Sequence, residues 1–295
     1  MQSKTDQPKF MVTGAAGWTG RRATQLLLDR GHAVRAFVRV DDDRARVLAD
    51  AGAEVVVGDM FRLDDVSRAL EGVHSAYFVY PIAPGLLEAT AVFAQAATET
   101  GVRAVVNMSQ ISARREATSN AAQQHWIGER LLDRAPFGVT HLRPTFFADN
   151  FIYSSGPIAQ EGVFRYPFGE GRHAPIAVED QAHVIAAVMA NPEPHAGKTY
   201  PLHGPVEMNH HEIAESFSKV LGRTITYEPI DRDRFAQFLT GAGYSEHLVQ
   251  HLTSVSIDYQ NGVFSGTNDV VPSVGKTTPT TIEDFIVAHR AVFMP

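Results

Sequence analysis

Three glycines near the N-terminus give the strongest chemical signal in the sequence. Gly14, Gly17 and Gly20 follow a short apolar run and precede an amphipathic stretch, so the turn joins a strand to a helix. Residues without Cβ let the chain turn tightly and approach a pyrophosphate, and a helix N-terminus offers free N–H groups to phosphate oxygens. The turn therefore predicts a dinucleotide site that also includes Trp18 and Thr19, with Trp18 either covering the pyrophosphate or packing on the sheet.

The end of the second predicted strand discriminates between the two nicotinamide dinucleotides. Arg39 lies 19 residues beyond Gly20, where an NAD site usually has an acid for the ribose 2′-hydroxyl. A guanidinium pairs instead with a 2′-phosphate, so the sequence favours NADP(H); the alternative is a solvated strand end. The acids that follow, Asp42 among them, are interpreted as N-cap and first-turn residues of the next helix.

A regular alternation of short β-branched runs and longer amphipathic stretches positions these residues. It extends from Phe10 to Arg143 and is typical of repeated βαβ units around a parallel sheet. The valines at 55–57 lack alternation, which predicts a strand buried on both faces. The expected strands are 9–13, 33–38, 54–57, 75–80, 103–108 and 138–143, and the expected helices are 18–30, 42–51, 63–70, 85–100 and 121–134.

The rhythm breaks after Pro144, where Gly, Pro and aromatic residues are frequent. A helix over 179–190 and a strand over 198–203 then predict a return to the first unit, and helices over 209–221, 232–241 and 280–293 predict a separate lobe. The predicted fold is α/β: a Rossmann-type doubly wound parallel sheet with a smaller, discontinuous C-terminal substrate lobe. Residues 1–150 and 177–205 are assigned to the NAD(P)-binding domain, and residues 151–176 and 206–295 to the smaller substrate-binding lobe.

The glycine spacing, GxxGxxG, resembles that of the short-chain dehydrogenase/reductase superfamily in its atypical forms. Ordinary members carry a Tyr-x-x-x-Lys pair on the helix after the fifth strand, whereas His125 and Glu129 have that spacing here. The His-x-x-x-Glu pattern, together with the segment 139–145, resembles the NmrA-like branch. That branch includes quinone reductases, triphenylmethane-dye reductases and catalytically silent NADP-sensing regulators.

The resemblance implies further cofactor contacts at the carboxyl ends of the strands, which face one crevice in an open α/β sheet. A segment after the third strand would hold the adenine ring, one after the fourth would line the nicotinamide ribose, and one after the fifth would lie beside the nicotinamide. Asp59 has the alternative interpretation of an ordinary helix cap. The residues in these three places are Asp59 and Met60, Tyr80 and Pro81, and Asn107 and Ser109.

The absence of the Tyr–Lys pair limits the kinds of substrate that the protein is expected to reduce. Hydride addition to an isolated ketone produces a basic alkoxide and needs a positioned acid, whereas a quinone or cationic dye gives a delocalised product that water can protonate. If an acid is required, His125 is the predicted donor, with Glu129 stabilising its charged form and Ser109 as a third candidate catalytic residue. The alternative is a helix-surface pair without a role in turnover.

Aromatic residues concentrate after the sixth predicted strand. Phe146, Phe147, Asn150 and Phe151 are predicted to bind a flat, conjugated substrate beside the nicotinamide. A plain aromatic core between two lobes is the alternative.

Composition excludes several other classes of protein. The 295 residues contain no cysteine, which excludes disulfides, thiolate metal sites and cysteine nucleophiles. A net charge of −7 argues against general affinity for nucleic acid or anionic membranes, and no apolar run approaches the length of a membrane span. No metal is predicted from the 13 histidines, a cytoplasmic location is expected, and the oligomeric state is left open.

The sequence thus predicts an NADPH-dependent reductase that transfers hydride to a quinone-like or other conjugated aromatic small molecule. Two alternatives stay open. One is a non-catalytic regulator that senses the NADP redox state and binds a protein partner. The other is a ketoreductase acting on a polycyclic secondary metabolite.

Overall fold

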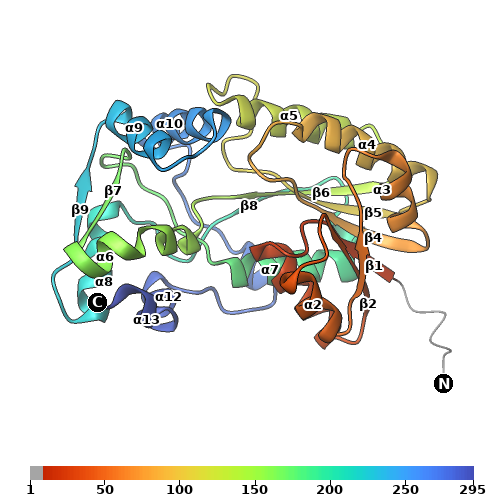
Figure 1. Ribbon diagram of the computed structural model, residues 1–295, viewed down its shortest axis with the longest axis horizontal. Coiled ribbons are helices and arrows are strands. Elements are labelled where there is room, and N and C mark those ends of the chain that lie inside the picture. The colour runs from red at the N-terminus through yellow and green to blue at the C-terminus, as the bar shows by residue number, and fades with distance from the viewer. Residues whose placement is uncertain (1–8) are drawn as a thin grey trace.

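The computed structural model describes residues 9–295, so the first eight residues of the predicted 1–150 domain lie outside it. A seven-stranded parallel sheet with the order β3-β2-β1-β4-β5-β6-β8 forms the larger lobe (Figure 1). The predicted doubly wound α/β fold is confirmed. The strands are β1 (Lys9–Val12), β2 (Ala33–Val38), β3 (Glu54–Val57), β4 (Val73–Phe78), β5 (Ala104–Met108), β6 (Gly138–Pro144) and β8 (Thr199–Leu202).

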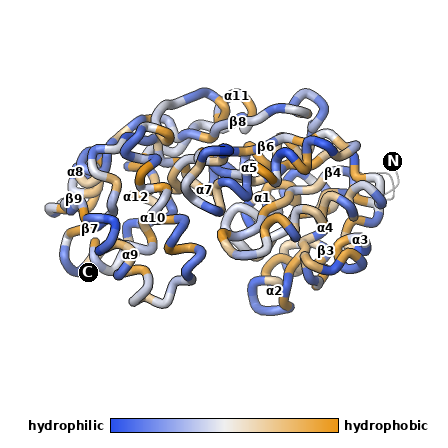
Figure 2. Tube along the Cα trace, turned by 90° about the horizontal axis from the view of Figure 1, so that it is seen from above, coloured by the Kyte–Doolittle hydropathy of each residue, from blue (hydrophilic) through white to orange (hydrophobic). Residues whose placement is uncertain are grey.

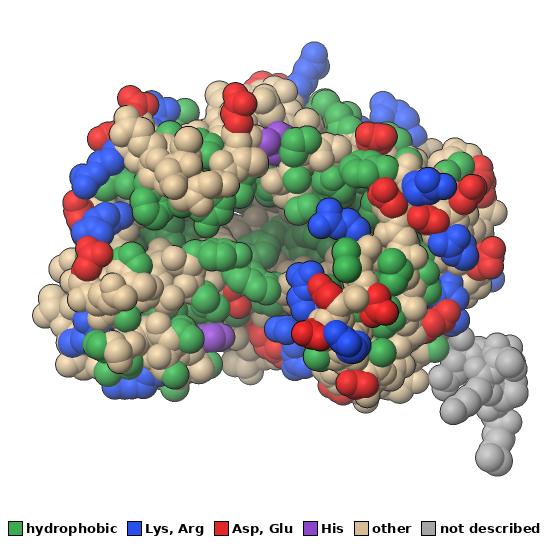
Figure 3. All heavy atoms as spheres, viewed as in Figure 1, with side chains coloured by type: hydrophobic (Ala, Val, Ile, Leu, Met, Phe, Trp, Pro, Cys, Tyr) green, Lys and Arg blue, Asp and Glu red, His purple; other side chains and the backbone are tan. Residues whose placement is uncertain are grey.

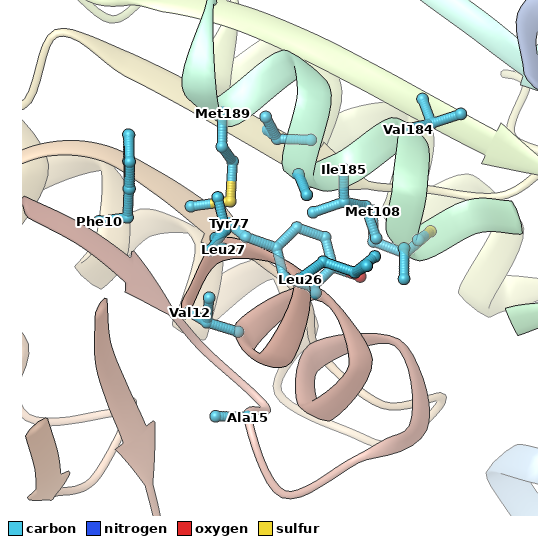
Figure 4. Packing of buried hydrophobic residues seen from close by; sticks show 14 of the residues in the cluster. Phe10, Val12, Ala15, Leu26, Leu27, Tyr77, Met108, Val184, Ile185 and Met189 are labelled. Carbon is cyan, nitrogen blue, oxygen red and sulfur yellow. The ribbon is translucent and has the colours of Figure 1, made fainter. Parts of the chain in front are cut away.

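Helices cover both faces of this sheet. On one face lie α1 (Trp18–Asp29), α2 (Asp43–Asp50) and α7 (Val178–Ala190), and on the other lie α3 (Leu63–Leu70), α4 (Leu86–Glu99) and α5 (Asn120–Leu132). Each face has its own hydrophobic cluster. Figure 4 shows the first, in which Leu27, Tyr77, Ile185 and Met189 meet between α1, α7 and the strands. Figure 2 shows a hydrophobic stretch at β3, whereas the loop at α2 is hydrophilic.

The prediction that the valines of β3 are buried on both faces is wrong. Among the described strands β3 pairs only with β2, so it is an edge strand of the sheet. Val57 is 45% exposed and Val55 and Val56 are half-buried. β-branched residues favour extended strands whether or not they are buried, so the three valines indicated a strand but not its burial.

The smaller lobe is built around an aromatic core. It contains the two-stranded parallel sheet of β7 (Val163–Tyr166) and β9 (Thr226–Pro229). The sequence analysis missed α10, and the helix expected over 280–293 is two helices separated at His289. The helical elements are η1 (Ala148–Ser154), α6 (Ser155–Glu161), α8 (His210–Leu221), α9 (Arg232–Gly241), α10 (Glu246–Gln260), α12 (Ile282–Ala288) and α13 (Arg290–Phe293), while the short η2 (Glu193–His195) precedes β8.

The two lobes pack against each other at two places. The short helix α11 (Val270–Ser273) lies within the segment assigned to the smaller lobe, yet Val270 and Val271 belong to the hydrophobic cluster beneath α7. Helix α10 packs on α5, where Ser119 Oγ lies 2.8 Å from Nδ1 of His251. No helix described over residues 9–295 is long and apolar enough to cross a membrane.

Candidate active site

The glycine turn between β1 and α1 has the close packing that a pyrophosphate loop requires. Gly14 has a φ of +55°, and a Cβ there would lie 2.7 Å from Cγ1 of Val79. A Cβ on Gly20 would lie 2.4 Å from the carbonyl oxygen of Gly14, to which the amide of Gly17 already donates at 2.8 Å. The turn therefore excludes side chains at these positions and leaves its backbone accessible, because Gly14 and Gly17 are exposed.

The N-terminus of α1 is suited to an anion. Gly17 is the N-cap, no side chain caps the helix, and its first turn contains no acidic residue. The free N–H groups and the positive end of the helix dipole are therefore available to phosphate oxygens. The order of the sheet reverses between β1 and β4, so this turn lies at the topological switch point where such folds bind ligands. These features fit a dinucleotide pyrophosphate.

Arg39 lies at the carboxyl end of β2 and is exposed. Two of the three acids after it are paired with residues of α2: Asp42 is the N-cap of α2 and also accepts hydrogen bonds from the guanidinium of Arg44, while Asp43 pairs with Arg46. Their predicted role as capping and first-turn acids is confirmed. Both carboxylates pair with arginines of α2, so neither contradicts the preference for NADP(H) predicted from Arg39.

The segments predicted to hold the adenine and the nicotinamide ribose follow the carboxyl ends of β3 and β4. Asp59 Oδ1 accepts a hydrogen bond from the amide of Phe61 at 2.9 Å, so its side chain forms a local turn, and Met60 is half-buried against the cluster under α3 and α4. Tyr80 donates to the carbonyl of Pro84 at 2.9 Å, and Pro81 is exposed. Burial, together with the charges of Asp59 and Glu88, raises the pKa of Tyr80 although Arg39 opposes this, so the Tyr80 phenol is neutral at pH 7.

Trp18 stacks on an aromatic residue of the other lobe. Its ring lies 5.4 Å from that of Tyr153 in η1, with an interplanar angle of 24°. Trp18 is half-buried and Tyr153 is 69% exposed. The next residue, Thr19, is buried and its hydroxyl lies 2.9 Å from the Tyr77 hydroxyl. The stack joins the lobes at the N-terminus of α1, and Figure 3 shows the hollow between the lobes, with hydrophobic side chains on its walls and Lys or Arg on its right rim.

At the end of β5, Asn107 and Ser109 are both buried. The Asn107 side-chain amide lies 2.9 Å from Nδ1 of His141, whose Nε2 lies 3.0 Å from Asp133, so a hydrogen-bonded chain fixes the Asn107 side chain. Ser109 Oγ is buried without a hydrogen-bond partner among the described residues. Its amide donates to the carbonyl of Leu142 at 2.8 Å and ties the loop after β5 to β6.

The expectation that Glu129 stabilises a charged His125 is wrong. Both residues lie on α5 and are buried, but the Glu129 carboxylate accepts two hydrogen bonds from the guanidinium of Arg143. Burial and the nearby His251 imidazole lower the pKa of His125 to about 3. His125 is therefore neutral at pH 7 and holds no proton to release as an imidazolium.

Two of the four residues predicted to bind substrate lie in the aromatic core instead. Phe151 is fully buried and its ring contacts those of Phe164 and Phe217, while Phe146 is 6% exposed in the same cluster. Their large apolar surfaces are buried where the smaller lobe needs a core. Phe147 and Asn150 are half-buried and stay candidates for the crevice wall.

Three features escaped the sequence analysis. These are the contact of Tyr153 with Trp18, the pairing of Arg143 with Glu129, and the approach of His251 to His125. Each joins residues from different elements, and no spacing rule connects them. Among residues 9–295, no group of three or more His, Asp or Glu side chains is arranged to hold a metal ion.

Comparison with known proteins identifies the family. The model of the NmrA-like family matches residues 6–286, so the chain belongs to the NmrA-like family, as the resemblance predicted. A curated relative, an NAD(P)H azoreductase of Xenophilus azovorans, is 28% identical over 286 residues, which cover 96% of this chain and 99% of the relative.

Solved structures agree with the fold. An NADPH-dependent quinone oxidoreductase of Escherichia coli in complex with NADPH superposes with a TM-score of 0.86 at 24% identity, covering 96% of this chain and 99% of the other. A triphenylmethane reductase of Citrobacter sp. gives a TM-score of 0.83 at 25% identity, covering 97% and 100%.

Proposed function

We propose that this protein is an NADPH-dependent reductase that transfers hydride to planar conjugated acceptors of the quinone type. The observation that carries the proposal is the glycine turn: a crowded, uncapped helix N-terminus at the switch point, with an exposed arginine at the end of β2. The relatives named as azo, quinone and triphenylmethane-dye reductases support an NAD(P)H-dependent oxidoreductase and differ in the acceptor they are named for.

Different residues bind different parts of the cofactor. Amides of the turn and of the first turn of α1 bind the pyrophosphate, Arg39 binds the 2′-phosphate, and Asp59 and Met60 border the adenine. Tyr80 and Pro81 border the nicotinamide ribose, and the backbone after Asn107 positions the nicotinamide. NADPH supplies the hydride when bound.

The protein's contribution to the reaction is mainly positioning. The hydrophobic walls of the hollow exclude water and hold a flat acceptor parallel to the nicotinamide, and this alignment accounts for much of the acceleration. Because His125 is neutral and Glu129 is paired, water supplies the proton to the delocalised product. Hydride transfer to an isolated ketone lacks a positioned acid here, which favours quinone-like acceptors over polycyclic ketones.

The test follows the absorbance of NADPH in purified protein with a benzoquinone, a triarylmethane dye, an azo dye and a polycyclic ketone. The proposal predicts oxidation of NADPH with at least one of the first three acceptors and none with the ketone. Cofactor binding, monitored by NADPH fluorescence in the same samples, is the control. Tight binding without oxidation by any acceptor would contradict the proposal and favour a redox-sensing regulator.

A further inference from the structure

The ion pair between α5 and β6 leaves one nitrogen of its arginine free. Nε of Arg143 donates to Oε1 of Glu129 at 2.8 Å, and Nη2 donates to Oε2. The Glu129 side chain is fully buried, whereas the Arg143 side chain is 22% exposed. The remaining nitrogen, Nη1, donates no hydrogen bond to the described residues 9–295 and is not one of their fully buried unpaired atoms. The pair therefore holds a guanidinium in a fixed orientation with an unused donor.

Arg143 lies where the two lobes meet. The loop after β5 runs beside it, because the amides of Ser109 and Ile111 donate to the carbonyls of Leu142 and Pro144, its two chain neighbours. Three residues later, Phe146 enters the aromatic core of the smaller lobe. In the sheet, β6 lies one strand beyond β5 on the side away from β1, so the proposed nicotinamide position at the end of β5 lies between the glycine turn and Arg143.

Two arginines and two carboxylates surround this site, so their formal charges balance. Glu129 is approached by a second guanidinium, that of Arg130, at 3.6 Å, and Arg130 also pairs with Asp133 at 2.7 Å. The Glu129 charge is thus shared between two arginines. A buried ion pair is often replaced by apolar side chains without loss of stability, so stability alone does not require an arginine here.

We propose that Arg143 binds the acceptor oxygen of the substrate through Nη1 and stabilises the negative charge that hydride transfer places there, with Glu129 as the positioning residue. The inference rests on the proposed function. A quinone that accepts a hydride, which is two electrons and one proton, from NADPH becomes a hydroquinone monoanion. The cofactor is oxidised to NADP⁺, and water then protonates the anion. A preorganised donor aimed at such an oxygen lowers the barrier where the charge develops.

Acceptor charge gives a readout that a merely structural role would not produce. Quinone reduction creates an anion, whereas reduction of a triarylmethane cation removes a positive charge. We expect Arg143→Gln to lower kcat/KM for benzoquinone about 100-fold, the effect typical of removing an oxyanion donor, and to leave the cationic dye unchanged or faster. Glu129→Gln, which keeps one of the two acceptor oxygens but removes the negative charge, is expected to slow the dye relative to the quinone.

Two controls separate chemistry from folding. Arg143→Gln leaves the Glu129 carboxylate buried without its partner, so the neutral double variant Glu129→Gln/Arg143→Gln is measured beside it. Arg114→Gln is the matched control, because Arg114 likewise makes two hydrogen bonds to a buried carboxylate, that of Asp258 on α10. We expect Arg114→Gln to affect both acceptors equally.

A binding measurement tests the proposal without turnover. We expect the pKa of 4-nitrophenol, monitored by its absorbance, to be lowered when it binds to NADP⁺-saturated wild-type protein, and not in the double variant. Equal pKa values in the two proteins, or no binding to the wild type, would overturn the role of Arg143. So would equal losses for quinone and dye in Arg143→Gln. Absence of NADPH oxidation with every acceptor would instead refute the proposed function, while the phenol pKa would still decide the inference.

Discussion

Arg39 is expected to determine which dinucleotide the protein binds. It is exposed at the end of β2, and the neighbouring Asp42 and Asp43 are paired with arginines of α2. A hydrogen bond to a charged group contributes about 1.5–3 kcal/mol, and solvent screening places an exposed residue at the lower end of this range. Since about 1.4 kcal/mol corresponds to a factor of ten, Arg39→Ala should weaken NADPH binding about tenfold and leave NADH nearly unchanged.

The assay is a fluorescence titration of wild type and variant with each reduced dinucleotide at two salt concentrations. The difference for NADPH should shrink at high salt, because the contact is electrostatic. Arg46→Ala is the matched control, since Arg46 is an exposed arginine of α2 that pairs with Asp43. Equal weakening of NADPH and NADH, or no change in either, would refute the assignment of Arg39 to the 2′-phosphate.

Three further predictions follow from the site and the cores. Gly20→Ala should abolish binding of both dinucleotides in the fluorescence titration, because a Cβ would lie 2.4 Å from the Gly14 carbonyl oxygen; wild-type affinity would contradict the geometry of the turn. Acid should destabilise the fold, because burial lowers the pKa of His125 and His173 to about 3 and that of His251 to about 4. In the unfolded chain these histidines bind protons from about pH 6.5 downward, whereas in the folded protein their buried rings stay neutral. Each histidine should therefore lower the free energy of unfolding by up to about 1.4 kcal/mol per pH unit as the pH falls, and the urea midpoint measured against pH tests this. His173→Phe should flatten this profile, and an unchanged slope would count against the assignment. Phe151→Ala should lower the free energy of unfolding by about 3–5 kcal/mol, and the milder Phe151→Leu should leave the acceptor KM unchanged, whereas a selective rise in KM would return Phe151 to the substrate pocket.

The fold was predictable because its signals are local. Strand and helix periodicity, together with the turn at Gly14, define repeated βαβ units, and a parallel sheet follows from their order. Helix α10 was missed because its polar and apolar residues give no clear periodicity, and it is held by contacts with α5, including Ser119 to His251. The exposed edge position of β3 likewise depends on strand order, which residue types do not encode.

The site was only partly predictable for a related reason. The glycines and Arg39 belong to one continuous segment, so their spacing was sufficient to place them on neighbouring strands. The partner of Glu129 could not be predicted from spacing. The i to i+4 rule favoured His125 on the same helix, whereas the Glu129 carboxylate pairs with Arg143 on β6. Aromatic residue type alone also did not separate the core position of Phe151 from the crevice wall.

The central claim is direct reduction of a planar acceptor by NADPH bound at the glycine turn. Single-turnover absorbance tests it most directly, with the protein preloaded with NADPH or with NADPH deuterated at the transferred position and then mixed with benzoquinone. The account predicts stoichiometric loss of NADPH and formation of hydroquinone, slower with the deuterated cofactor. NADPH that stays bound and reduced in the presence of the quinone would contradict it.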